Sequence, residues 1–173
     1  MVQLFTSYYD SPTGLVEIKG TEEAVFSILF IDVDVRVPSN SKAPDAVKKC
    51  LKQLDEYFTG KRKTFDFAMD QEGTLFQKKV WNELLNIPYG KTISYMELSR
   101  RIGDTKAIRA VGTTNGKNQL SIVVPCHRVI GSDGSLTGYG GGLWRKKWLL
   151  EHELKWSAGV QVLFPHDVKD SSS

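Results

Sequence analysis

The sequence predicts an α+β protein: a small N-terminal α/β domain with an antiparallel sheet, then a mostly helical C-terminal domain containing a helix-turn-helix. Near the N-terminus, three apolar runs are separated by short turns of glycine, proline and charged residues, which is typical of a meander. Beyond residue 73, hydrophobic residues recur at helical spacing behind capping signals. With 173 residues, 40% of them hydrophobic, the chain can form one good core or two small ones.

The N-terminal domain is expected to span residues 1–72. Its three strands are predicted at 4–9, 14–19 and 24–30. Pro44 then begins a helix whose apolar side chains recur every three or four residues, at Val47, Leu51, Leu54 and Phe58. No group of chemically reactive residues occurs before residue 70, so this domain is expected to be structural.

The C-terminal domain is expected to span residues 73–156, with an irregular tail at 157–173. Thr74 and Gln77 form a capping-box pattern before one helix, and Ser94 and Glu97 form a second before another. A further helix is predicted at 106–115, after the stop at Gly103. Two short helices joined by a tight turn are typical of a helix-turn-helix.

Charge is concentrated in this predicted motif. Residues 100–117 contain five cations and one anion, whereas the whole chain has a net charge of only +3. A basic segment on a nearly neutral protein favours contact with nucleic acid, although a short basic run is often just a solvated helix face.

Residues 122–130, IVVPCHRVI, hold the strongest chemical signal. The run Ile122–Val124 predicts a short buried strand that Pro125 ends, with Cys126 held at its end. Buried cysteines are usually inert. Here a histidine follows directly, with an arginine-bearing helix upstream and a glutamate-bearing helix downstream, which favours a reactive thiol.

Two segments follow the reactive one. Residues 131–142 contain six glycines around Tyr139 and predict a loop that approaches a ligand closely, or simply a mobile loop. Residues 143–153 predict a helix with Leu143, Leu149 and Leu150 facing inward and the cluster 145–147 facing outward.

Composition narrows the class of protein. The sequence shows no targeting signal and no apolar run long enough for a membrane span, so an intracellular, cytoplasmic protein is expected, or a nuclear one in a eukaryote. Cys50 lies on a helical pattern and is expected to pack as a hydrophobe. The three histidines and two cysteines lack ligand spacing, so neither a metal nor another cofactor is expected.

Three blocks together resemble the O6-alkylguanine-DNA alkyltransferase family, also called methylated-DNA–protein-cysteine methyltransferases: Arg109-Ala110-Val111-Gly112, Pro125-Cys126-His127-Arg128-Val129 and Tyr139-Gly140-Gly141-Gly142-Leu143. The resemblance is strong from about Thr74 to Glu153 and general before that. It implies direct repair of double-stranded DNA that carries O6-alkylguanine, with O4-alkylthymine as a further substrate.

The resemblance assigns the chemistry to four side chains. Cys126 is the nucleophile and methyl acceptor. His127 is a base that acts through a water molecule, and Glu153 orients it. Tyr95 donates a proton to the guanine and crowds a phosphate to favour rotation of the nucleotide. The product is a thioether, so one transfer per molecule is expected: a suicide enzyme.

The resemblance also assigns binding residues. Arg109 fills the place of the extruded base, and Asn118 braces the helix-turn-helix against the reactive segment. The implied DNA-binding residues are Arg109, Tyr95, Lys106, Ala110, Asn118 and Arg128. The implied substrate-binding residues are Tyr139, Gly140, Val129 and Asn115. The protein is expected to act as a monomer, with cooperative binding along DNA left open.

Three other functions remain possible from the residues. A lesion-binding protein would flip the base without transfer, but such relatives lack the cysteine. A helix-turn-helix regulator would protect one defined sequence. A cysteine hydrolase would turn over many times and would need an oxyanion hole, for which the sequence offers no distinct candidate.

Overall fold

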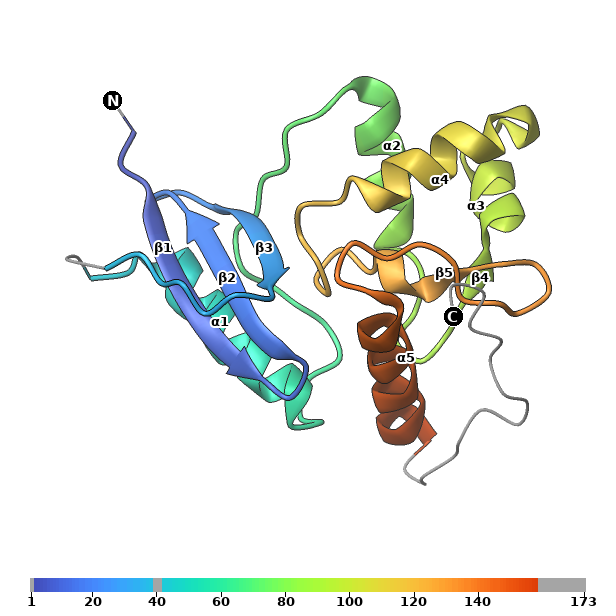
Figure 1. The fold of residues 1–173 in the computed structure, drawn as a ribbon. Helices are drawn as coiled ribbons and strands as arrows, with labels where there is room; N and C mark the ends of the chain where they lie inside the picture. The colour runs from blue at the N-terminus through green and yellow to red at the C-terminus, as the bar shows by residue number, and fades with distance from the viewer. Residues whose placement is uncertain (1, 39–41, 159–173) are drawn as a thin grey trace. The chain divides into compact units, whose positions relative to one another are not determined.

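The computed structural model describes residues 2–38 and 42–158 (Figure 1). The chain divides into two compact units. The first comprises the residues up to Glu72 together with Gln119–Val123, and the second comprises Gly73–Asn118 and the residues from Val124 onward.

The first unit is a three-stranded antiparallel sheet with one helix on it (Figure 1). Its strands, in the order β1-β2-β3, are β1 (Phe5–Ser11), β2 (Gly14–Gly20) and β3 (Val25–Ile31). Helix α1 (Asp45–Phe58) packs against all three strands. The predicted antiparallel sheet is confirmed, with strand ends shifted by one or two residues.

The second unit is mostly helical. Its elements are α2 (Leu75–Leu84), β4 (Ile93–Ser94), α3 (Tyr95–Arg101), the 3-10 turn η1 (Thr105–Ala107), α4 (Ile108–Gly116), the 3-10 turn η2 (Cys126–Arg128), β5 (Val129–Ile130) and α5 (Leu143–Ala158). Helices α3 and α4 pack on each other across η1, as expected for a helix-turn-helix. Strands β4 and β5 pair in parallel, which places the chain after η2 beside the start of α3.

Capping explains where two of these helices begin. The Thr74 hydroxyl accepts from the Gln77 amide at 3.1 Å, and the Gln77 side chain accepts from the Thr74 amide at 3.0 Å, so the predicted capping box is complete. Ser94 accepts from the Glu97 amide at 3.0 Å. The Glu97 carboxylate instead pairs with Arg100 and Arg101 on the next turn, so the second box is only half formed.

The core of the second unit contains the face of α2. Val80 and Leu84 are fully buried, and the Trp81 indole donates to the Thr114 carbonyl at 3.0 Å inside the protein. This bond satisfies the indole N–H and ties α2 to α4. The interpretation of Trp81 as a core residue, not a base-stacking one, is consistent with this burial.

The predicted strand at 122–124 is wrong. Leu120 forms one parallel bridge with Ile28, and the Ser121 amide donates to the Ile28 carbonyl, but the chain then turns away. The Val123 amide donates to the Ser121 carbonyl at 2.8 Å, and Ile122 has a φ of 73°, which describes a γ-turn of the rare, strained kind. The β-branched residues therefore pack as buried turn residues, and tertiary burial overrides their strand propensity.

Residues 2–38 and 42–158 contain neither a candidate membrane-spanning helix nor a candidate metal site. No helix there combines the length and the apolar character that a membrane crossing requires. Nor do three or more histidine, cysteine or carboxylate side chains gather there as a possible metal site.

Candidate active site

Tight turns, and not a strand, hold the thiol of Cys126. The Cys126 amide donates to the Val124 carbonyl at 2.8 Å, and Pro125 between them has φ −82° and ψ 65°, the geometry of an inverse γ-turn. Proline suits this position because its ring restricts φ to about this value. Cys126 then begins η2 and is 6% exposed.

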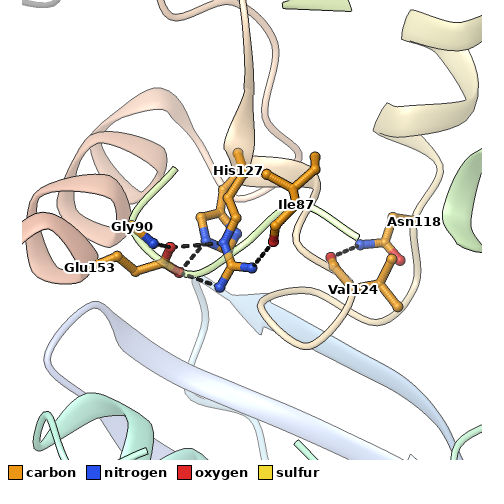
Figure 2. Close-up of polar contacts among 7 residues, drawn as sticks. Ile87, Gly90, Asn118, Val124, His127 and Glu153 are labelled. Carbon is orange, nitrogen blue, oxygen red and sulfur yellow. Dashed lines mark hydrogen bonds and ion pairs between the residues drawn. The ribbon is translucent and has the colours of Figure 1, made fainter. Parts of the chain in front are cut away.

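Two asparagines, one in the last turn of α4 and one just beyond that helix, hold this turn by hydrogen bonds. The Asn118 amide nitrogen donates to the Val124 carbonyl at 2.7 Å (Figure 2) and lies 3.3 Å from the Cys126 sulfur. The Asn115 amide nitrogen donates to the Cys126 carbonyl at 3.2 Å. Asn118 therefore joins the segment after α4 to the reactive turn by hydrogen bonds, and the bracing role that the resemblance implies for it stays a prediction.

Glu153 of α5 accepts four hydrogen bonds from three residues (Figure 2). His127 Nε2 lies 2.6 Å from Glu153 Oε2. Arg128 reaches the same carboxylate with Nε at 2.8 Å and Nη2 at 3.1 Å. The Gly90 amide donates to Oε1 at 3.2 Å, and Arg128 Nη1 donates to the Ile87 carbonyl at 2.6 Å.

This buried network determines the charges of its members. Burial alone would raise the pKa of Glu153, but attraction and hydrogen bonds from His127 and Arg128 outweigh it and hold the pKa far below its usual range. Burial lowers the pKa of His127, and attraction to Glu153 only partly opposes this. The stable arrangement is therefore an ionised Glu153, a charged Arg128 and a neutral His127.

A neutral His127 has only one ring proton. The 2.6 Å contact with the ionised carboxylate assigns that proton to Nε2, so Nδ1 carries a lone pair. Nδ1 is buried and has no hydrogen-bond partner among the described residues. A buried acceptor of this kind is suited to receive a proton, directly or through a water molecule.

The Cys126 thiol is protonated at rest. Burial raises its pKa, while the Asn118 hydrogen bond and the positive charge of Lys146 oppose the rise. Because only the thiolate is a strong nucleophile, a base is required next to this thiol. His127, the next residue in the chain, has a free lone pair for that task.

A second polar group ties α3 and α5 to the glycine-rich segment. The Tyr95 hydroxyl donates to the Thr137 carbonyl at 3.1 Å, and the Lys146 ammonium donates to the same carbonyl at 2.9 Å. Lys146 is fully buried, and Arg145 is 4% exposed. The expectation that cluster 145–147 faces outward is therefore wrong for these two cations and holds for Lys147.

The spacing of α5 contained the signal for Lys146. It lies three residues after Leu143 and four before Leu150, on the same helix face as the inward leucines. The charge of Lys146 predicts exposure to solvent, whereas its position on this helix face indicates burial. Ile87 and Gly90 were missed for a different reason, since their backbone groups take part and no side-chain pattern reveals them.

Three predicted DNA-binding residues lie on one exposed stretch. Lys106 in η1 and Arg109 and Ala110 at the start of α4 are all exposed. Tyr95, predicted for both roles, lies at the first position of α3 and is partly buried. The predicted substrate residues Tyr139 and Gly140 lie in the segment after β5, and Val129 is buried in β5.

Two predicted DNA contacts need correction. Arg128 is 6% exposed, and its guanidinium is occupied by Glu153 and the Ile87 carbonyl. Asn118 is likewise 6% exposed, with its amide nitrogen turned to the Val124 carbonyl and the sulfur. Both side chains support the reactive turn from inside, so neither is available to a DNA strand in this structure.

Two family descriptions and many curated relatives match most of the chain. Residues 75–155 match the DNA-binding domain of 6-O-methylguanine DNA methyltransferase, and residues 4–71 match its ribonuclease-like domain. The methylated-DNA–protein-cysteine methyltransferase of Mycolicibacterium paratuberculosis is 44% identical over 158 residues, covering 90% of this chain and 95% of the relative. The protein of that name from Methanosarcina acetivorans is 42% identical, covering 87% and 98%.

Solved structures give the same result. The O6-methylguanine methyltransferase of Mycobacterium tuberculosis superposes with a TM-score of 0.78 at 42% identity, covering 88% of this chain and 94% of the other. A complex of the M. tuberculosis protein with DNA superposes with a TM-score of 0.77 at 44% identity, covering 86% and 93%. The chain belongs to the 6-O-methylguanine DNA methyltransferase family.

Proposed function

We propose that this protein repairs DNA by moving a methyl group, or another alkyl group, from O6 of guanine to the sulfur of Cys126. One observation carries the proposal. The buried thiol of Cys126, hydrogen-bonded by Asn118, is followed in the chain by a neutral His127, whose Nε2 is held by the ionised Glu153. Relatives that match nearly the whole chain are named for transfer from methylated DNA to a protein cysteine. We further propose O4-alkylthymine as a second substrate.

The reaction balances without a cofactor. A water molecule carries the thiol proton of Cys126 to Nδ1 of His127, and Glu153 stabilises the resulting imidazolium. The sulfur then bonds to the alkyl carbon as the bond from that carbon to O6 breaks, and the electron pair moves into the guanine ring. Tyr95 donates a proton to a ring nitrogen and regains one from water, while the His127 imidazolium releases its proton to water, so the thiol proton is balanced by the proton gained by guanine.

Placing the Cys126 sulfur correctly contributes more to the rate of alkyl transfer than ionising it does. At neutral pH a free thiol is already a few per cent thiolate, so complete ionisation would raise the nucleophile by only about thirty-fold. Holding the sulfur in line with the alkyl carbon can lower the activation free energy by several kcal/mol. The γ-turn at Pro125 and the two asparagine hydrogen bonds supply this rigidity.

Once Cys126 has become a thioether, the protein molecule cannot react a second time. A thioether has no acidic proton and is not cleaved by a neutral histidine. We therefore propose one transfer per molecule, by a protein that acts as a monomer in the reducing cytoplasm or nucleus, where free thiols persist.

The alkylated base must leave the duplex before the buried sulfur can reach it. The exposed cation Arg109 at the start of α4 is proposed to occupy the vacated space, with Lys106 and Ala110 beside it. Tyr139, Gly140, Val129 and Asn115 are proposed to surround the extruded base. Residues 1–72 are proposed to support this unit without contributing a reactive group.

The deciding experiment is intact-protein mass spectrometry after mixing with a duplex that contains one O6-methylguanine. We expect a gain of about 14 Da on one residue, which peptide mapping places on Cys126, and a yield that saturates at one methyl per protein. Binding of the duplex without any mass gain would support a lesion-binding protein. Repeated turnover on an acyl substrate would support a hydrolase. Either outcome would contradict the proposal.

Changing Arg109 to alanine is expected to slow single-turnover repair about 10- to 100-fold, because an inserted side chain offsets part of a flipping cost of a few kcal/mol. Lys78→Ala on α2 removes the same unit of charge from an exposed position outside the basic segment. A rapid-quench assay should show the loss for the first variant and not the second. Equal repair rates for Arg109→Ala and Lys78→Ala would contradict the role proposed for Arg109.

A further inference from the structure

The side chain of Asn115 carries a buried acceptor that no group in the described part of the chain uses. Asn115 lies in the last turn of α4 and is 3% exposed. Its amide nitrogen donates to the Cys126 carbonyl at 3.2 Å. Its side-chain oxygen Oδ1 is buried and has no hydrogen-bond partner among residues 2–38 and 42–158. Such an atom calls for an explanation, because leaving a buried acceptor unpaired is costly.

The neighbouring carbonyl fixes which way the Asn115 amide group points. A carbonyl oxygen can only accept a hydrogen bond, so the Cys126 carbonyl requires the amide nitrogen of Asn115, and not Oδ1, on its side. Oδ1 therefore lies on the other side of the amide group. Burial raises the pKa of Tyr95, and the Asn115 side chain is close enough to the Tyr95 hydroxyl to oppose that rise. The amide group thus lies next to both the Cys126 carbonyl and the Tyr95 hydroxyl.

The Cys126 carbonyl has no acceptor capacity to spare. A carbonyl oxygen has two lone pairs and accepts two hydrogen bonds at most in ordinary geometry. Here one donor is the Asn115 side chain, and the other is the backbone N–H of Val129, which closes the η2 turn. A donor that enters the site beside Cys126 is therefore better served by Oδ1 of Asn115, which is free, than by this carbonyl.

An alkylated guanine brings one kind of hydrogen-bond donor into such a site. Once O6 carries an alkyl group, the ring nitrogens of the base have no hydrogen and act as acceptors. The exocyclic 2-amino group is then the donor of the base. O4-alkylthymine, by contrast, offers N3 and O2 as acceptors and has no N–H group. A buried acceptor without a partner is therefore complementary to the guanine lesion and not to the thymine lesion.

We propose that Asn115 is a specificity-determining residue: its Oδ1 accepts a hydrogen bond from the 2-amino group of the extruded O6-alkylguanine. This inference rests on the proposed function and gives one of the residues around the base a particular task. A base with an amino group satisfies the buried acceptor, whereas a base without one leaves it unpaired. The site therefore favours O6-alkylguanine over O4-alkylthymine.

Removing the amino group from the substrate tests this hydrogen bond directly. O6-methylhypoxanthine is O6-methylguanine without its 2-amino group, and it keeps the same methyl group and the same leaving oxygen. The experiment measures single-turnover transfer from a duplex that contains one or the other base, with the protein in excess over DNA but below saturation. The wild-type protein should repair O6-methylguanine about 10- to 100-fold faster, as expected for one buried hydrogen bond.

Asn115→Leu separates this hydrogen bond from the other differences between the two bases. Leucine is similar in shape to asparagine but offers no acceptor. The variant also loses the hydrogen bond to the Cys126 carbonyl, but that loss affects both substrates and cancels in the ratio of their rates. We expect the ratio to fall about tenfold or more, because repair of O6-methylguanine slows more than repair of O6-methylhypoxanthine. Asn82→Leu, the same change at an exposed position on α2, should keep the wild-type ratio.

The outcomes keep the role of Asn115 distinct from the proposed function. An equal ratio in wild type and Asn115→Leu would overturn the role of Asn115, because another acceptor would then read the amino group. A wild-type ratio near one would overturn it as well, and in both cases the proposed function would stand. A wild-type protein that gains no methyl group from O6-methylguanine would overturn both. If Asn115→Leu fails to fold, Asn115→Ala takes its place, and the same comparison of ratios decides.

Discussion

Replacing Cys126 by alanine is expected to abolish alkyl transfer completely while preserving binding to alkylated DNA. The sulfur is the only atom that gains the alkyl group in the proposed reaction, and alanine offers no nucleophile. The second cysteine cannot take over, since Cys50 is fully buried on α1 and burial raises its pKa to about 12. The loss should therefore be total and not partial.

The measurement pairs mass spectrometry with a binding titration on the same oligonucleotide duplex. Cys126→Ala should show no mass gain after hours, and an affinity within about threefold of wild type, because the DNA-binding residues are untouched. Cys50→Ala serves as the control and should transfer one methyl at the wild-type rate. Methylation of Cys126→Ala at any other residue would show that the acceptor has been assigned wrongly.

Replacing Glu153 by glutamine is expected to have the second-largest effect, on both stability and rate. The change removes the only carboxylate that the described residues place on Arg128, and leaving a buried cation without its partner costs about 3–5 kcal/mol. It also replaces the ionised acceptor that fixes the His127 proton on Nε2 by a neutral amide, which can either accept from that nitrogen or donate to it. Loss of an oriented base is expected to slow transfer about 10²- to 10⁴-fold.

The pH dependence of stability tests the same network. The pKa of Glu153 lies far below its ordinary value of 4.5, so its contribution to stability is present above pH 4.5 and is lost as the pH falls further. The pKa of His127 lies below its ordinary value of 6.5, so the unfolded chain binds this proton more readily and stability falls as the pH drops below 6.5. Both effects make the fold acid-labile.

Denaturant unfolding at several pH values compares Glu153→Gln with wild type. The variant should be less stable at neutral pH and should lose less stability on acidification, because the most strongly shifted carboxylate is gone. Glu151→Gln, on the same helix but partly exposed, is the control and should behave as wild type. Parallel pH curves for Glu153→Gln and wild type would show that the buried network does not determine acid stability.

Much of the fold could be predicted from the sequence because local signals and tertiary structure agree there. The three N-terminal strands follow the turn residues between them, and Thr74 with Gln77 forms the capping box that the spacing predicted. The reactive centre could also be predicted, since Cys126 and His127 are neighbours in sequence. The partnership of His127 with Glu153, which are 26 residues apart, came from the family resemblance and agrees with the 2.6 Å contact.

The failures have a common physical cause. Arg128 and Lys146 are charged, and charge alone predicts solvent or DNA, yet both lie inside the protein. Arg128 is tolerated there because Glu153 neutralises it, and Lys146 because neutral oxygens surround it. Such compensation depends on groups far away in the chain, so no local pattern reveals it. The strand expected at 122–124 failed similarly, since propensity is a weak guide once the side chains are buried.

The turn at Ile122 places opposing demands on that position. Its φ of 73° favours glycine, whereas its fully buried side chain requires a large hydrocarbon. Glycine would relieve about 1–3 kcal/mol of backbone strain but would remove a whole isoleucine from the interior, at a cost of about 2–5 kcal/mol or more. Alanine would keep the backbone strain and would also lose most of the buried hydrocarbon of isoleucine. Substitutions meant to raise the free energy of unfolding should therefore leave Ile122 unchanged and be placed on solvent-facing helix positions instead.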